Sequence, residues 1–396
     1  MSGKEAKAVV PKLRFPEFRE AVAWEEKEVG EIFKVTRGEV LSMRLVSDMP
    51  SETTPYPVYS SQTKNNGLSG YYSDFLYENA ITWTTDGANA GDVNYRPGKF
   101  YCTNVCGVLI NNDGYANVFI AELLNTITRK HVSYIGNPKL MNGVMAKIKI
   151  ILPPLPEQQK IAHCLSSLDE VIGLQAKKVQ ALKQHKKSLM QQLFPAEGET
   201  TPRLRFPEFR EAGAWEVKRL GEVANISMGA SPKSASYNDQ RIGLPLIQGN
   251  ADIKDRKSSP RLFASQITRE CWVGDILVGV RAPVGMVAKS EHHACIGRGI
   301  SALCVKGEDR QEFLYQWLLW YEPHWVSISQ GGTFDSVNKN EITNLVALFP
   351  NPSEQQKIAH CLSSLDEVIG LESHKLDALK NLKKGLMQQL FPQDVA

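Results

Sequence analysis

The stretch EQQKIAHCLSSLDEVIGL occupies residues 157–174 and returns without a single change at residues 354–371. Downstream of it, KSLMQQLFP (187–195) returns as KGLMQQLFP (384–392). An internal repeat of this fidelity indicates one structural unit that is built twice. The repeat therefore decides how the rest of the chain is read.

Apolar residues recur at steps of three and four through both copies, a spacing that predicts one helix of about 38 residues in each, with a coiled-coil seam. Two seam positions are polar in both copies, Gln175 and Lys186 in the first and Glu372 and Lys383 in the second. The seam of the first copy comprises Ile161, Leu165, Leu168, Ile172, Gln175, Val179, Leu182, Lys186, Leu189 and Leu193.

Two packing arrangements of these helices are open. Each apolar seam can pack on its own neighbouring domain, or the two helices can pack on each other. We favour the second arrangement, in which the pseudo-twofold symmetry of the repeat makes the helices antiparallel, with a domain at each end of a rod. Val171, Leu174 and Ala181 widen the seam and indicate a second packing surface. Ser353 and Gln356 have the spacing of a capping box at the start of the second helix.

A second repeat precedes each variable part of the chain. PKLRFPEFREAVAWEEKEVGEIF (11–33) returns as PRLRFPEFREAGAWEVKRLGEVA (202–224), whereas segments 34–150 and 225–347 do not match each other. Short apolar runs broken by Gly, Asn, Asp and Pro predict strands in both segments, with helices at Val118–Lys130 and Gln311–Tyr321. We therefore predict an α+β fold with an internal pseudo-twofold repeat. Its parts are a mixed-sheet domain (1–150), a long helix (151–198), a second mixed-sheet domain (199–347) and a second long helix (348–396).

Composition narrows the class of protein. The formal net charge is only +3, so a nucleic-acid-binding chain would have to concentrate its positive charge on one face. No apolar run is long enough to span a membrane, and the start MSGKEAKAVV lacks the apolar core of a signal peptide. The seven cysteines form no C-x-x-C pair, which favours reduced, mostly buried thiols in a cytoplasmic protein without a metal site.

The loops between the predicted strands are rich in amide, hydroxyl and basic side chains, the groups that read base edges and grip phosphates. The alternative is that these segments are ordinary turns made of turn-forming residues. As a set we interpret them as nucleic-acid-binding loops, with Arg281 and Arg298 suited to guanine and Lys64, Lys254 and Lys257 suited to phosphates. The candidate DNA-binding residues are Ser61, Gln62, Lys64, Asn65, Asn66, Thr85, Asp86, Asn89, Gln248, Asn250, Lys254, Arg256, Arg281, Arg298, Gln330 and Thr333.

Several catalytic patterns are incomplete. Glu17 with Glu25-x-Lys27 is similar to a nuclease carboxylate motif, but its spacing is short and it lies in an amphipathic setting. Gly297-x-Gly299 precedes a predicted strand, whereas a dinucleotide-binding loop precedes a helix. There is no phosphate-binding G-x-x-x-x-G-K-[ST] loop and no (N/D)PP(Y/F) motif of an amino-methyltransferase. We therefore expect no catalytic residue in this chain.

Taken together, these motifs resemble the specificity subunit of type I restriction–modification systems. The resemblance covers almost the whole chain and rests on LRFPEF…W (13–24 and 204–215), G-E-(I/V) (30–32 and 221–223), P-x-x-EQ-x-K-I (154–161), NPSEQQKI (351–358) and SQGGT (329–333).

The resemblance implies two target recognition domains that each read half of a split double-stranded DNA site, with the helices setting the gap between the halves. It implies docking of two modification (methyltransferase) subunits, joined by restriction (endonuclease and translocase) subunits. S-adenosylmethionine, ATP and Mg would be held by those partners and no cofactor by this chain. Aromatic residues of the repeated box are candidates for partner docking or for attaching each domain to the helices. They are Phe15, Phe18, Trp24, Phe206, Phe209 and Trp215.

Two rival functions remain open. One is a self-sufficient nuclease–methyltransferase, which needs a cofactor-binding core. The other is a coiled-coil scaffold whose variable domains bind protein or sugar rather than DNA. Methyl transfer by the isolated chain would indicate the first, and failure of the assembled complex to bind duplex DNA would indicate the second.

Overall fold

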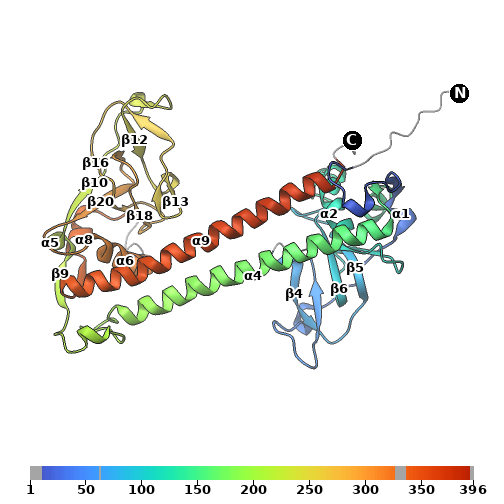
Figure 1. Cartoon of the computed structure of the whole chain (residues 1–396), viewed down its shortest axis with the longest axis horizontal. Coiled ribbons are helices and arrows are strands. Elements are labelled where there is room, and N and C mark those ends of the chain that lie inside the picture. Colours follow the sequence, from blue (N-terminus) through green and yellow to red (C-terminus); the bar gives the residue numbers. More distant parts are fainter. Residues whose placement is uncertain (1–10, 62–63, 326–335, 393–396) are drawn as a thin grey trace. The chain divides into compact units, whose positions relative to one another are not determined.

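A computed structural model describes residues 11–61, 64–325 and 336–392. The chain forms two compact units, each of which combines one variable segment with parts of both long helices (Figure 1). Unit 1 comprises residues 1–176 and 374–396, and unit 2 comprises residues 177–373. The boundaries between the units therefore fall inside the long helices and not at their ends.

Unit 1 is built on a six-stranded mixed sheet in the order β2-β7-β5-β6-β3-β4, with a separate two-stranded sheet of β1 and β8. The helices α1 (Val29–Ile32), α2 (Val118–Ile127) and α3 (Asn142–Ala146) accompany these sheets, and Phe119, Ile120, Leu123 and Leu124 of α2 are buried in the core. The strands are β1 (Glu25–Glu28), β2 (Lys34–Arg37), β3 (Tyr56–Tyr59), β4 (Leu68–Tyr72), β5 (Tyr77–Thr84), β6 (Val93–Cys102), β7 (Cys106–Ile110) and β8 (Lys149–Leu152).

Unit 2 has two larger sheets, β10-β20-β17-β18-β14-β13 and β11-β15-β12-β19-β16, and the small sheet of β9 and β21. Its helices are α5 (Leu220–Val223), α6 (Gln311–Tyr321) and α8 (Lys339–Asn344). The strands are β9 (Glu216–Arg219), β10 (Ala224–Met228), β11 (Tyr237–Asn238), β12 (Leu244–Ile247), β13 (Ile253–Lys254), β14 (Lys257–Ser258), β15 (Leu262–Ala264), β16 (Glu270–Cys271), β17 (Ile276–Gly279), β18 (Val287–Lys289), β19 (Ala294–Ile296), β20 (Ile300–Val305) and β21 (Val346–Phe349).

The two long helices, α4 (Leu155–Leu193) and α9 (Pro352–Leu390), each contain 39 residues, which confirms the predicted helices (Figure 1). The halves of α4 and α9 that share a unit run antiparallel. In unit 2, Lys178 of α4 pairs with Glu372 and Lys186 pairs with Asp366, so position numbers rise along one helix as they fall along the other. The helices also pack on their domains, because Leu193 and Ile358 lie in the same core as Phe313 of α6. Both packing arrangements considered from the sequence are therefore present.

The predicted seam is buried or half-buried along its whole length, including Gln175 and Lys186. The predicted widening of the seam is wrong. Leu174 is 60% exposed and its repeat equivalent Leu371 is 70% exposed, and Val171 and Ala181 are exposed as well. Their exposure shows that these positions do not mark a second packing surface.

The polar seam positions form matching ion pairs. In unit 2, Lys186 donates to Asp366 at 2.6 Å, and in unit 1 the equivalent Lys383 donates to Asp169 at 2.9 Å and to Glu122 of α2 at 2.7 Å. Burial lowers the pKa of Lys186 despite its bond to Asp366. Burial also acts to lower the pKa of Lys383, but hydrogen bonds to two carboxylates outweigh it and raise the pKa.

The two copies of the repeated box are fixed to the long helices by the same contacts. In unit 1 the Arg14 guanidinium forms a buried two-pronged bond to the Glu157 carboxylate, at 2.8 and 2.7 Å. In unit 2 Arg205 binds Glu354 in the same way, with both bonds at 2.7 Å. We call residues 11–33 with 152–165, and 202–224 with 349–362, the frame of each unit.

One local prediction was wrong. The helix α9 is capped by Asn351, whose Oδ1 accepts a hydrogen bond from the Glu354 N–H at 3.0 Å, and not by Ser353. Pro352 occupies the first helical position, where its missing N–H costs nothing, so the cap lies one residue before it.

The remaining elements lie close to their predicted places. The α+β fold is confirmed, and the predicted helices at Val118–Lys130 and Gln311–Tyr321 correspond to α2 with the following η4 turn and to α6. All seven cysteines are free, with Cys102, Cys106, Cys271 and Cys295 buried. Within the described residues, no helix combines the length and the apolar character that crossing a membrane requires.

Candidate nucleic-acid interface

Three segments of unit 2 meet at one edge of its sheets. They are Gln248–Asn250 after β12, Val280–Pro283 after β17 and the turn Gly297–Gly299 before β20. Backbone hydrogen bonds join the three segments. The Gly297 N–H donates to the Ile247 carbonyl at 2.8 Å, and the Gly299 N–H donates to the Gln248 carbonyl at 3.1 Å. The Val280 N–H donates to the Gly299 carbonyl at 2.9 Å. We call this set of segments the recognition edge of unit 2.

Unit 1 has an equivalent edge although its sequence does not match. Thr103 N–H donates to the Tyr59 carbonyl at 2.9 Å, and Thr85 N–H donates to the Val105 carbonyl at 3.1 Å. These bonds correspond in place to the Gly297–Ile247 and Val280–Gly299 bonds of unit 2. The described part of the recognition edge of unit 1 therefore consists of residues 60–61 and 64–67 after β3, Thr85–Asn89 after β5 and Thr103–Val105 before β7.

A further contact strengthens the correspondence. The backbone of Asp86 forms an isolated antiparallel β-bridge with Lys139, and the backbone of Arg281 forms the equivalent β-bridge with Ser336. The next residue on each partner segment donates its N–H to the edge, Leu140 to Thr85 at 2.9 Å and Val337 to Val280 at 3.0 Å. The predicted residues Asp86 and Arg281 thus occupy equivalent positions in the two units, with opposite charges.

The edge also identifies a residue that the sequence prediction missed. Asn104 is the exposed residue of the turn Thr103–Val105, at the position that Arg298 occupies in unit 2. Asn104 lies in no amide-rich run, and only the repeated hydrogen-bond pattern links it to Arg298. An alignment guided by the strand order β2-β7-β5 and β10-β20-β17 would have found it.

In unit 2 several predicted residues come together on the edge. Arg281 and Arg298 are exposed, and the Arg298 backbone and Nε both donate to the Ser231 hydroxyl, at 3.2 and 3.4 Å. Gln248 is half-exposed, while the Asn250 side-chain amide donates to the Pro283 carbonyl at 2.7 Å and so joins two of the loops. Arg281, Arg298 and Gln248 are the side chains of this edge that remain available to a ligand.

Arg256, another of the predicted DNA-binding residues, is bonded within unit 2. Its guanidinium forms a two-pronged bond to the Glu322 carboxylate, at 2.6 and 2.7 Å, and also donates to the Val287 carbonyl. The hydrogen bonds to Glu322 raise the pKa of Arg256. These bonds attach the β13–β14 hairpin to the η8 helix (Glu322–His324), while Arg256 itself is exposed. Lys254, which precedes this turn, is exposed.

In unit 1 two residues of the loop after β3 have left-handed backbone conformations. Asn65 and Asn66 are exposed, with φ angles of 51° and 52°, a region that asparagine tolerates better than most residues. The buried Arg96 donates to the Asn66 carbonyl at 2.6 Å and stacks 3.7 Å from the centre of the Tyr59 ring. Desolvation lowers the pKa of Arg96, which acts here as a support for the loop.

The other predicted residues of unit 1 differ in availability. Thr85 is buried and its hydroxyl donates to the Val105 carbonyl at 2.9 Å, so its side chain supports the edge and does not face a ligand. Ser61, Asp86 and Asn89 are half-exposed, and Asp86 lies 3.6 Å from the Lys139 ammonium. Gln62, Gln330 and Thr333 lie outside the described residues, as does the side chain of Lys64.

The aromatic residues of the frame divide into two groups. Trp24 is buried against Phe119 of α2, and Trp215 is buried between Phe194 and Phe313, positions that attach each domain to the helices. Phe15, Phe18, Phe206 and Phe209 are half-buried, and the ammonium groups of Lys160 and Lys357 lie 5.7 Å from the Phe15 and Phe206 ring centres. Only this second group remains accessible for partner docking.

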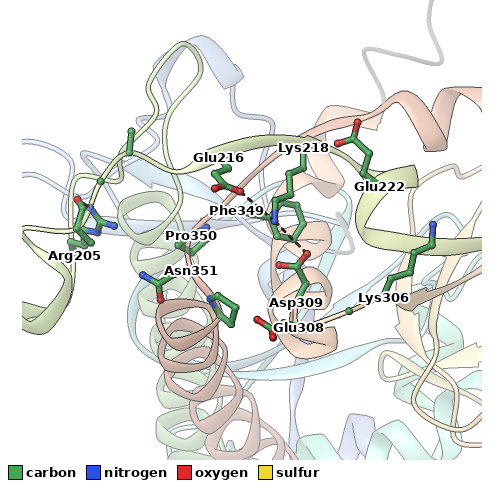
Figure 2. A pocket seen from close by; sticks show the side chains of 15 residues that line it. Arg205, Glu216, Lys218, Glu222, Lys306, Glu308, Asp309, Phe349, Pro350 and Asn351 are labelled. Atoms are coloured by element: carbon green, nitrogen blue, oxygen red, sulfur yellow. Dashed lines mark hydrogen bonds and ion pairs between the residues drawn. The ribbon is translucent and has the colours of Figure 1, made fainter.

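A cavity of about 550 Å³ opens beside the frame of unit 2, lined by charged side chains from the repeated box and from residues 306–309 after β20 (Figure 2). Lys218 lies between Glu216 at 3.5 Å and Asp309 at 3.6 Å, so it offsets part of their negative charge. In the equivalent frame of unit 1, Glu17 pairs with Lys160 and Glu25 with Lys27, which leaves the nuclease-like carboxylates bound to separate lysines. Among the described residues, no group of three His, Cys, Asp or Glu side chains could hold a metal ion.

Comparisons with known proteins agree with this arrangement. A model of the type I restriction modification DNA specificity domain matches twice, at residues 21–184 and 213–381. The MjaX specificity subunit of a type I restriction enzyme from Methanocaldococcus jannaschii is 27% identical over 93% of this chain and 92% of its own length. A type I specificity subunit N-terminus from Mycoplasma pneumoniae is 42% identical over 35% of this chain and 75% of its own length.

Solved structures share the fold. The crystal structure of a type I restriction–modification S subunit from M. genitalium aligns with a TM-score of 0.70 and 17% identity, over 98% of this chain and all of the other. A chain from a study of complex assembly in a type I restriction–modification system aligns with a TM-score of 0.57 and 22% identity, over 94% of this chain and 98% of the other. The chain belongs to the type I restriction modification DNA specificity family, and its role is DNA recognition rather than catalysis.

Proposed function

We propose that each unit reads one half of a bipartite duplex DNA site through its recognition edge. The observation that supports this best is that the two edges are built by the same backbone bonds but carry different side chains. Arg281 and Arg298 in unit 2 stand where Asp86 and Asn104 stand in unit 1. A shared backbone with exchanged side chains fits two readers of two different half-sites.

The chemistry of the exposed side chains agrees with base reading. Arginine pairs in a two-pronged manner with guanine O6 and N7, and asparagine or glutamine pairs with adenine, each contact discriminating by about 1–3 kcal/mol. Arg281, Arg298 and Gln248 of unit 2 can make such contacts, as can Asn65 and Asn66 of unit 1. Lys254 is suited to a phosphate, which would add affinity without sequence preference.

The partners follow from the repeated frame. Two frames with the same contacts offer two equivalent docking surfaces, so we propose that two modification subunits bind this chain and that restriction subunits join them. Those partners, and not this chain, would bind S-adenosylmethionine, ATP and Mg. We place this assembly in the cytoplasm, where the free thiols of this chain would persist.

The long helices are proposed to set the gap between the half-sites. Deleting one heptad from each helix, residues 174–180 and 371–377, keeps the seam in phase and removes about 10.5 Å of helix. At 3.4 Å per base pair the preferred gap should shrink by about three base pairs. Selection from a DNA library with variable gaps measures this, and a folded variant with an unchanged gap would refute the proposal.

The proposed half-site reading is tested with alanine variants in the assembled complex. Arg281→Ala and Arg298→Ala should each cost about 1–3 kcal/mol on the cognate site and relax the preference at one base pair of the second half-site only. Lys254→Ala is the matched control, which should weaken binding to all sequences alike and reduce the salt dependence. The half-sites themselves are read from the methylation pattern of host DNA. A complex that binds no duplex, or variants with unchanged preference, would contradict the proposal.

A further inference from the structure

A hairpin of unit 1 carries two exposed apolar side chains at its tip. Ser133 and Lys139 exchange both backbone hydrogen bonds, each at 2.9 Å, and Gly136 turns the chain with a φ of 76°. Between them Tyr134 is 69% exposed and Ile135 is 94% exposed. Isoleucine is among the residues most often buried, and Ile135 is the most exposed of the large hydrophobic residues that the structure describes.

The hairpin is firmly attached to the recognition edge. Gly87 N–H donates to the Pro138 carbonyl at 2.9 Å, and the Trp83 indole donates to the Leu140 carbonyl at 3.0 Å. The residues on either side of the hairpin, Val132 and Leu140, are buried in the core of unit 1. The backbone therefore holds the apolar tip in place beside the loop Thr85–Asn89.

Cationic side chains lie on both sides of the hairpin. Arg129 and Lys130, in the η4 helix (Thr128–His131), precede it and Lys139 follows its tip, all of them exposed. Arg129 pairs with Asp92 at 2.7 Å and Lys139 lies 3.6 Å from Asp86. Exposed ion pairs of this kind contribute little stability, so both cations can turn to a phosphate at small cost.

We propose that the hairpin 133–139 is a wedge that inserts Ile135, supported by Tyr134, between neighbouring base pairs of the half-site read by unit 1. Proteins that bend DNA use apolar side chains in this way and recover the cost of unstacking through wider contact with the duplex. Arg129, Lys130 and Lys139 would hold the flanking phosphates. The inference rests on the proposed DNA recognition and adds residues that no amide-rich motif identified.

The test uses Ile135→Ser in the complex with modification subunits, on DNA carrying 2-aminopurine in turn at each position of the first half-site. The wild-type complex should raise the fluorescence at one step, because the probe brightens when it is unstacked. Ile135→Ser should abolish this rise and weaken binding to the first half-site about tenfold, with the salt dependence and the second half-site unchanged. Met49→Ser is the control, since Met49 is 72% exposed in unit 1 and lies in neither the frame nor the recognition edge.

Four results would overturn the wedge. Sequence-specific binding without any rise in fluorescence, or Ile135→Ser with wild-type binding, would reject it while leaving DNA recognition intact. Loss of the modification subunit from Ile135→Ser, with DNA preference retained by what remains assembled, would make the tip a protein-docking site instead. A wild-type complex without sequence-specific binding would reject the proposed function itself and the wedge with it.

Discussion

Replacing Arg205 by methionine is expected to destabilise unit 2 by about 3–5 kcal/mol, because it leaves the buried Glu354 carboxylate without its partner. Arg205 binds both oxygens of Glu354 and also donates to the Ala212 carbonyl at 2.6 Å, and the two side chains are only 10% and 1% exposed. The pair joins the repeated box to the first turn of α9. Since whole domains are stable by only about 5–15 kcal/mol, the loss should lower the unfolding temperature of unit 2 by many degrees.

Lys357→Ala is the matched control for this prediction. Lys357 lies 3.1 Å from Glu208 in the same frame, but both side chains are about half exposed, and an exposed pair is worth at most about 1 kcal/mol. Arg205→Met with Glu354→Leu should recover part of the loss, because no charge is then buried alone. Urea unfolding of the full chain measures all of these. Equal effects of Arg205→Met and Lys357→Ala would show that burial of the pair does not matter.

The frame could be predicted from the sequence because its amino-acid sequence occurs twice in the chain. The periodic seam gave the two helices, and the polar seam positions Lys186 and Lys383 were visible, although their partners Asp366 and Asp169 were not. The error over Leu174 and Leu371 has a simple cause. Periodicity identifies apolar positions, but it does not show how many faces of a helix find a partner.

The recognition edges were only partly predictable. Amide-rich composition identified the loops, but composition does not say which way a side chain points. Thr85 has suitable chemistry for DNA but is buried and uses its hydroxyl inside the protein, whereas Arg256 is exposed and bonded to Glu322. The equivalence of Asn104 with Arg298 is carried by backbone hydrogen bonds, which almost any residue can make. Two domains can therefore share a reading edge without sharing a recognisable sequence.

This division also explains why the frame is repeated and the edges are not. Every frame contact must be the same twice if two identical partners are to bind, whereas identical edges would read the same half-site twice. A backbone that holds its loops through main-chain bonds leaves the exposed side chains free to change. Positions at which the main chain itself is crowded are the exception, and they should not tolerate substitution.

Gly229→Ala should therefore abolish reading by unit 2 while leaving unit 1 intact. A Cβ at Gly229 would lie 2.1 Å from the Gly297 carbonyl oxygen and 2.8 Å from the Ile300 carbonyl oxygen, and both are backbone atoms that cannot rotate away. The turn Gly297–Gly299 would have to move, which would displace Arg298 and break the Gly229–Ile300 hydrogen bond of 2.9 Å. We expect a loss of about 2–3 kcal/mol in stability, as for other overpacked sites.

The effect of Gly229→Ala is measured by binding the variant complex to DNA in which one half-site is altered at a time. Gly229→Ala should remove discrimination at the second half-site by more than about tenfold and preserve it at the first. Gly38→Ala should do the reverse, because a Cβ there would lie 2.1 Å from the Cys102 carbonyl oxygen of the equivalent turn. Gly213→Ala, which has open space around it, is the control and should change neither. If Gly229→Ala kept its preference at the second half-site, the turn that carries Arg298 would have no part in reading.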